Sequence, residues 1–236
     1  MAWVAGRPLA IFVAFAVCAG ASVELPGKAP LPGARPAPPA AAPDATPPLA
    51  SAGVPAEEAA CRARLRALGV SFSEHGRLSE PAAGCLVEYP VAVRALGPDI
   101  PLEPEAVMNC AMAEAAARFA HDTISPEAER IFGSPLAGVS QASAYVCRTR
   151  HGQSKISEHA LGNALDLAAF RLKDGTGIEV KAYGPAEPLR SRFLRSLRAR
   201  ACGPFKTVLG PGSDADHALH LHLDLQQRRN GGTYCQ

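Results

Sequence analysis

Polar and apolar residues alternate strictly in the segment 219–225, which reads Leu-His-Leu-His-Leu-Asp-Leu. Such alternation is typical of a β-strand, in which successive side chains point to opposite faces of a sheet. We therefore expect His220, His222 and Asp224 on one face of this strand and the leucines on the other. A second predicted strand covers residues 165–170 and carries Asp166.

Other segments predict helices and further short strands. Apolar residues at helical spacing predict helices at Ala59–Leu68, at Ala106–His121 and in the basic amphipathic segment Pro188–Ala201. Strands are predicted over residues 70–72, 85–89, 142–147, 178–180 and 205–209, with a hairpin turn at 173–177. The sequence has no internal repeat. This mixture indicates an α+β domain with a small antiparallel sheet and flanking helices.

The N-terminal quarter of the chain has a different composition. Residues 1–7 carry one positive charge, residues 8–17 are an apolar run and residues 19–21 are small, which predicts a signal peptide over residues 1–21. The apolar run is short for a membrane span, although retention as an anchor stays open. Residues 22–58 are rich in Pro and Ala and are predicted to be a disordered linker. Residues 59–236 then form one domain.

Charge and cysteine content narrow the functional class. The chain has 24 Lys and Arg against 22 Asp and Glu, so its formal charge of +2 does not favour nucleic-acid binding. The predicted domain contains an even number of cysteines behind an export signal, which indicates disulfides. Proximity along the chain suggests Cys61–Cys85 and Cys202–Cys235 and leaves Cys110–Cys147, although fifteen pairings are possible.

Histidines and a carboxylate cluster in two segments, 157–166 and 217–222. A catalytic zinc ion typically takes three protein ligands and leaves a fourth position for water. We predict that His159, Asp166 and His222 are these ligands, since Gly162-Asn163 interrupts the chain and lets a loop carry His159 back towards Asp166. A Ser157–His159 nucleophile is less favoured because no nucleophile elbow is present. The isolated histidines are expected to be surface or core residues: His75, His121 and His151.

Residues 157–166 followed by 220–222 resemble the zinc signature S-x-H-x-x-G-x-A-x-D…H-x-H of the LAS-type metallopeptidases, which include D-Ala-D-Ala carboxypeptidases. More narrowly, residues 143–148, residues 207–212 and the cysteine positions resemble the bacterial extensin-like protein C-terminal family. This resemblance covers about Cys61 to Cys235. It implies an LAS-like fold, in which the zinc site lies on the sheet.

The resemblance also implies roles for individual residues. His159, Asp166 and His222 match the zinc ligands, and His220 matches the histidine beside the catalytic water. Two residues take positions similar to residues near the substrate, Ser157 and Arg148. Arg148 is either a clamp for a carboxylate or a surface charge, and His217 is a secondary candidate. One departure concerns the general base: carboxypeptidases of this group often have Glu three positions before the last ligand, where this chain has Leu219. His220 would then have to take or relay the proton.

Together these features predict an exported zinc peptidase of the periplasm or cell envelope that hydrolyses amide bonds in peptidoglycan peptides. It would hold one Zn²⁺ per chain and have no membrane span after cleavage of the signal peptide. The first alternative is a zinc-containing module that binds or supports the cell wall without catalysis. The second is a zinc-stabilised domain that binds another protein.

Overall fold

The computed structural model describes residues 54–236. The predicted signal peptide and the predicted linker up to residue 53 lie outside the described residues. The first helix, α1 (Ala56–Ala67), begins three residues before the predicted start of the domain at residue 59. In residues 54–236, no helix has the length and apolar character that a membrane crossing requires.

Within the described residues, nine strands form one sheet in the order β1-β4-β5-β6-β7-β10-β9-β11, with β8 beside β7. Its strands are β1 (Ser71–Glu74), β4 (Pro90–Ala95), β5 (Pro101–Asn109), β6 (Leu136–Ser143), β7 (Ala164–Leu172), β8 (Gly177–Glu179), β9 (Thr207–Leu209), β10 (Leu221–Asp224) and β11 (Tyr234–Cys235). The remaining two, β2 (Leu78–Glu80) and β3 (Cys85–Val87), pair as a separate hairpin.

The α+β class is as predicted, but the sheet is larger than expected and is not purely antiparallel. Strands β5 and β6 run parallel, and so do β9 and β11. A parallel pair needs a long crossover connection, and helices α2 (Cys110–Phe119) and α3 (Ser125–Phe132) supply it between β5 and β6. The π-helical turn η2 (Ala120–Ile124) joins these two helices.

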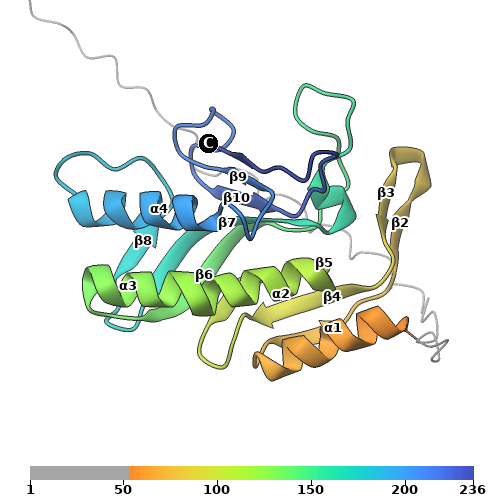
Figure 1. Ribbon diagram of the computed structural model, residues 1–236, viewed down its shortest axis with the longest axis horizontal. Helices are drawn as coiled ribbons and strands as arrows, with labels where there is room; N and C mark the ends of the chain where they lie inside the picture. Colours follow the sequence, from red (N-terminus) through yellow and green to blue (C-terminus); the bar gives the residue numbers. More distant parts are fainter. Residues whose placement is uncertain (1–53) are drawn as a thin grey trace, which may run out of the picture. The chain divides into compact units, whose positions relative to one another are not determined.

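The helices cover one face of the sheet (Figure 1). The last of them, α4 (Pro188–Ala201), has the predicted bounds. Leu165 and Leu167 of β7 belong to the same hydrophobic core as the buried residues of these helices. Because side chains alternate along a strand, Asp166 points to the opposite face, away from the helices. The sheet thus keeps its polar residues apart from its core.

The predicted helix 106–121 is wrong at its N-terminal end, because residues 106–109 complete strand β5. Ala106 and Met108 are buried and pair with β4, so sheet pairing overrides the helical preference of Ala and Met. The helix begins only after Asn109, whose Oδ1 accepts a hydrogen bond from the Met112 backbone N–H at 2.8 Å. Asn is a favoured residue at this capping position.

Three disulfides link the described chain, and only Cys202–Cys235 was predicted correctly. The other two pairs are Cys61–Cys110 and Cys85–Cys147, so the expected Cys61–Cys85 and Cys110–Cys147 bonds are wrong. Helix α1 packs against α2, which brings Cys61 to the start of that helix, while β3 carries Cys85 to the loop after β6. Sequence proximity fails here because the fold places more distant segments side by side.

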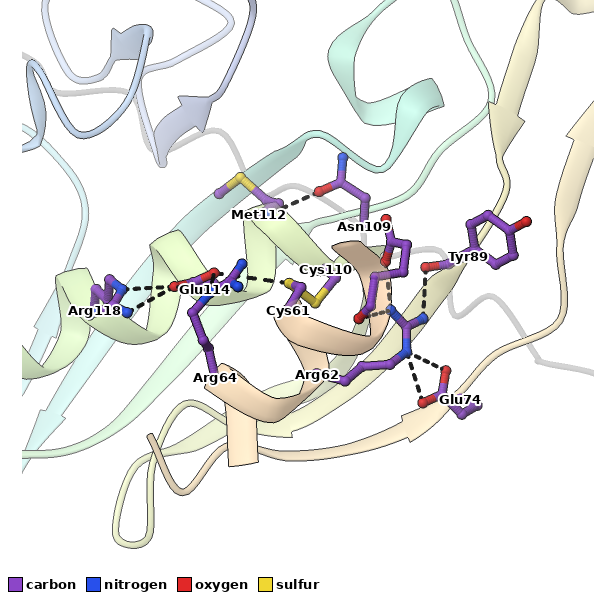
Figure 2. The surroundings of a disulfide bond; sticks show 11 residues. Cys61, Arg62, Arg64, Glu74, Tyr89, Asn109, Cys110, Met112, Glu114 and Arg118 are labelled. Carbon is purple, nitrogen blue, oxygen red and sulfur yellow. Dashed lines mark hydrogen bonds and ion pairs between the residues drawn. A yellow bond between two sulfur atoms is a disulfide. The ribbon is translucent and has the colours of Figure 1, made fainter. Parts of the chain in front are cut away.

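Helix α1 is also fixed by a buried arginine next to Cys61 (Figure 2). Arg62 is 4 % exposed. Its guanidinium donates to Glu58 at 2.6 Å, to Glu74 of β1 at 2.9 Å and to the Tyr89 carbonyl at 3.2 Å. These bonds satisfy the buried cation and join the helix to the edge of the sheet.

A short 3₁₀ turn, η3 (Glu158–Leu161), carries one predicted metal ligand and ends at Gly162. Gly162 has a φ of 60°, and a Cβ at this position would lie 2.9 Å from the Asn109 backbone nitrogen. The same Asn109 N–H donates to the Gly162 carbonyl at 2.8 Å. Glycine is therefore required both for the left-handed backbone and for the close approach of the turn to α2.

We expect Gly162→Ala to lower the free energy of unfolding by more than Gly133→Ala does. Gly133 at the end of α3 has a φ of 71° with no atom near its potential Cβ, so alanine there costs only the left-handed strain of about 1–2 kcal/mol. Gly162→Ala adds steric overlap with the backbone, worth about 1–3 kcal/mol more. Urea unfolding of both variants measures the difference. Equal losses would contradict a tight approach at Gly162.

Candidate metal centre

Asp166 and His222 face each other on neighbouring strands. Strands β7 and β10 pair antiparallel, and in their register His222 lies opposite Asp166. Leu221 and Leu223 of β10 enter the core, so His222 shares the polar face of the sheet with Asp166. The η3 turn brings His159 to the same point, as the break at Gly162-Asn163 predicts.

The three predicted ligands form a compact buried group. His159 Nε2 lies 3.2 Å from Asp166 Oδ2 and 3.2 Å from His222 Nδ1. His222 Nδ1 lies 2.8 Å from Asp166 Oδ1. The exposed fractions are 1 % for His159, 3 % for Asp166 and 9 % for His222. One ligand atom from each side chain lies within 4.8 Å of the others, so the group could hold a metal ion.

The outer nitrogen of each imidazole has an acceptor as its partner. His159 Nδ1 donates to the Ala144 carbonyl at 2.6 Å, and His222 Nε2 donates to Asp224 Oδ2 at 3.2 Å. A carbonyl can only accept, and Asp224 Oδ1 already accepts the Gln226 backbone N–H at 3.0 Å. Such partners fix the tautomer of metal-binding histidines and direct the other nitrogen to the ion.

As a consequence, three acceptors converge on one small volume. With their protons on the outer nitrogens, both imidazoles present lone pairs to each other and to the Asp166 carboxylate. This arrangement is repulsive unless a cation lies between the acceptors, because buried polar atoms need partners of opposite polarity. Two imidazoles and one carboxylate are a donor set that suits Zn²⁺. The residues therefore fit a metal ion.

In the metal-free protein, a proton can take the place of the cation. Burial by itself lowers the pKa of His222, but hydrogen bonds to Asp166 and Asp224, together with their negative charges, raise it to about 9. Burial would raise the pKa of Asp166, but its bonds to His159 and His222 hold that pKa far below the usual range. His222 thus keeps its proton at neutral pH when no metal is bound, and this proton lies between the imidazole and the carboxylates.

The group lies in a cleft of about 630 Å³ that also contains the other candidate residues. His220 is half-buried, and its Nε2 lies 3.7 Å from Asp166 Oδ1. Burial lowers the pKa of His220, and the negative charge of Asp166, which by itself would raise this pKa, does not cancel the effect; the positive charges of the neighbouring histidines lower it further. Neutral His220 can therefore accept a proton. His217 contacts it at 5.1 Å between ring centroids, and Asp214 Oδ1 lies 2.6 Å from His217 Nδ1.

Arg148 and Ser157 also line the cleft but differ in exposure. Arg148 is exposed, and within residues 54–236 no carboxylate pairs with its guanidinium. It directly follows Cys147, whose disulfide to Cys85 anchors this loop. Ser157 is buried, and its Oγ accepts the His159 backbone N–H at 3.4 Å. Ser157 thus caps the η3 turn that carries His159.

The isolated histidines have different surroundings. His75 is exposed. His151 is also on the surface, but it lines the cleft, and its Nδ1 lies 2.6 Å from Asp216 Oδ2, which lines the same cleft. His121 is half-buried in η2, and its Nε2 has no hydrogen-bond partner among the described residues.

Sequence reasoning missed several residues around the centre. The alternation in residues 219–225 predicts the correct face for Asp224 but not its hydrogen bond to His222. Its position two residues after a predicted ligand on the same face could have indicated this contact. The remaining missed residues form side-chain hydrogen bonds around the centre, and no spacing rule points to them: Asp214, Glu158, Asn163 and Gln226.

A comparison with protein-family models assigns the chain to a family. The model for the C-terminus of extensin-like proteins matches residues 59–236. The chain belongs to the extensin-like C-terminal family. The matched range includes every candidate residue of the cleft, so the narrower of the two predicted resemblances is confirmed. A search of curated proteins and a search of solved structures found no match. The wider kinship with LAS-type metallopeptidases stays a prediction.

We expect the metal-free protein to lose stability as the pH rises through about 9. The pKa of His222 is raised from 6.5 to about 9 in the folded state, so its contribution is complete below pH 6.5 and disappears above pH 9. The loss is on the order of 3 kcal/mol. Urea unfolding from pH 6 to 10 in the presence of a chelator measures it. The difference between the wild type and His222→Gln should shrink over this range, whereas the difference between the wild type and His75→Gln should stay constant.

Proposed function

We propose that the protein is an exported zinc-dependent peptidase that hydrolyses amide bonds in the peptide part of peptidoglycan. The observation that carries this proposal is the buried His159–Asp166–His222 group in an open cleft. The resemblance of its motif to LAS-type metallopeptidases supplies the substrate class. Three disulfides favour an oxidising compartment such as the periplasm, in agreement with the predicted signal peptide.

His159, Asp166 and His222 would hold the ion. Structural zinc sites use four protein ligands, whereas catalytic sites use three and keep a position for water or substrate. A bound zinc ion would polarise a scissile carbonyl and lower the pKa of water. The buried leucines of β7 and β10 hold two of the ligands on a rigid sheet, which favours a fixed geometry.

His220 is the best candidate for the proton acceptor. It directly precedes β10, its Nε2 lies 3.7 Å from Asp166 Oδ1, and it remains neutral at neutral pH because burial lowers its pKa. A neutral imidazole in this position can take a proton from water and pass it to the leaving amine. His217, which is oriented by Asp214, lies next to it and can accept or return the proton.

Arg148 is the best candidate for holding the substrate. Its guanidinium is exposed on the wall of the cleft and has no carboxylate partner among residues 54–236. A guanidinium binds a carboxylate through two parallel hydrogen bonds, and peptidoglycan peptides carry free carboxylates. Arg150, the other arginine of the cleft, lies 3.9 Å from Glu158 and is therefore partly neutralised.

One observation favours a second function, a zinc-containing module that binds or supports the cell wall without turnover. Leu219 occupies the position where related carboxypeptidases often have a glutamate base, and it is 69 % exposed. The cleft would then retain its metal and its carboxylate clamp but have a weaker base. Cleavage of muropeptides decides between the two functions.

We expect the oxidised full-length protein to bind about one zinc ion per chain. Asp166→Ala should abolish this binding, because it removes one of three ligands. Asp99→Ala, which removes an exposed carboxylate, should leave it unchanged. Metal analysis after dialysis measures the stoichiometry. Folded wild-type protein that binds no zinc when zinc is supplied would refute the proposed function.

We expect His220→Ala to retain zinc and to lose hydrolysis of purified muropeptides. The rate should fall by roughly 10²–10⁴-fold, which is the usual contribution of a general base. His75→Ala is the matched control for loss of a histidine. Released fragments are measured by mass spectrometry. Undiminished cleavage by His220→Ala would remove its role, and sacculus binding without any cleavage by the wild type would favour the wall-binding module.

A further inference from the structure

Glu158 is a buried carboxylate beside the metal centre that the mechanism does not use. It is 7 % exposed and directly precedes the ligand His159. Its Oε2 accepts from Asn163 Nδ2 at 2.7 Å, and its Oε1 accepts from Gln226 Nε2 at 2.9 Å. Because both oxygens are occupied by donors, Glu158 is not placed to act as the missing base.

The direction of these bonds is set by the backbone of helix α2. The Met112 backbone N–H can only donate, so it fixes Asn109 with its Oδ1 towards the helix. Asn109 Nδ2 then donates to Asn163 Oδ1 at 3.0 Å, which turns the Asn163 amide nitrogen towards Glu158. Residue 158 must therefore be an acceptor on this side, and Asn163 cannot rotate without breaking the chain of bonds.

A second branch connects Glu158 with the other ligand histidine. Gln226 donates its side-chain amide to Glu158 and its backbone N–H to Asp224 Oδ1 at 3.0 Å. Asp224 in turn accepts from His222. The backbone adds a parallel link, because Leu225 N–H donates to the Asn163 carbonyl at 3.2 Å. Glu158 thus joins the turn that carries His159 to the strand end that orients His222.

We propose that Glu158 and Asn163 are positioning residues for the metal centre, which hold the η3 turn so that His159 meets Asp166 and His222. Residues 159 and 166 lie on one connected segment, but His159 lies on the η3 turn outside the sheet, where its own bond to the Ala144 carbonyl and the bonds of this turn hold it. The hydrogen bond between the Glu158 carboxylate and the Asn163 amide fixes the orientation of this turn, which its backbone alone would leave free to vary. This inference rests on the metal site of the proposed function and adds the residues that set its geometry.

The test is an exchange of the carboxylate and the amide. Asn163→Asp places two carboxylates 2.7 Å apart in nearly unchanged shape, which should push the η3 turn out of position. Glu158→Gln combined with Asn163→Asp restores a donor between the pair, and the bonds to Asn109 and Gln226 are kept. The exchange has the same net charge as the wild type.

We expect Asn163→Asp to weaken zinc binding about 10–100-fold, as is usual when a group that orients metal ligands is lost. The exchanged variant should return to within about three-fold of the wild type. The full-length oxidised protein is titrated against a chromophoric chelator, and the visible spectrum of the Co²⁺-loaded protein reports ligand geometry independently. Both the spectrum and the affinity should change in Asn163→Asp and recover in the exchanged variant.

The sign of the effect separates positioning from charge. An added negative charge near a cation would by itself tighten zinc binding, so tighter or unchanged binding by Asn163→Asp would overturn the inference. Failure of the exchanged variant to recover would also overturn it.

Gly133→Ala is the control for lost stability alone and should retain wild-type zinc affinity. If Asn163→Asp does not fold, Gln226→Leu, which removes the other donor without adding charge, should weaken zinc binding, and unchanged affinity would overturn the inference. Absence of zinc from the wild type refutes the proposed function instead.

Discussion

Three hydrogen-bond acceptors that face one another without a donor are the central constraint of this structure. His159 Nε2, His222 Nδ1 and the Asp166 carboxylate lie 2.8–3.2 Å apart, and all three side chains are buried. Such a group is unstable unless a proton or a metal ion neutralises the repulsion. Burial by itself lowers the pKa of His222, but its hydrogen bonds to Asp166 and Asp224 raise this pKa, so its imidazole can keep a proton that relieves this repulsion. The remaining parts of the domain can be understood as the framework that keeps these acceptors together.

The two faces of the sheet have different roles in this framework. On one face, leucines of β7 and β10 pack under the helices and fix the strand register. On the other face, the same register places Asp166 beside His222 and leaves a cleft above them. A shift of either strand by one residue would send its ligand into the core, so core packing and metal-site geometry depend on the same alternation. Zinc and peptide hydrolysis are the proposals that account best for this arrangement.

The sequence was most informative where a local pattern reflects a local cause. The alternation in residues 219–225 and the basic amphipathic pattern of Pro188–Ala201 predicted a strand and a helix that the structure contains. Predictions from the sequence were wrong where contacts with a distant segment of the chain determine the local structure. Residues 106–109 have the composition of a helix but pair with β4, because a buried strand position is worth more than helix propensity. Two of three disulfide pairs were likewise wrong, since they depend on which segments the fold brings together.

By itself, the sequence determined the types and spacing of the candidate ligands, since residue chemistry and strand alternation are local properties. It also predicted the break at Gly162-Asn163 that lets His159 turn back. Only the tertiary structure decided that β7 and β10 are neighbours, that Ala144 and Asp224 orient the imidazoles, that Asn109 reaches Asn163 and that Gln226 reaches Glu158. Apart from the neighbouring His222–Asp224 pair, those contacts join residues that are far apart along the chain, and their formation depends on the packing of the whole sheet, which no short pattern encodes.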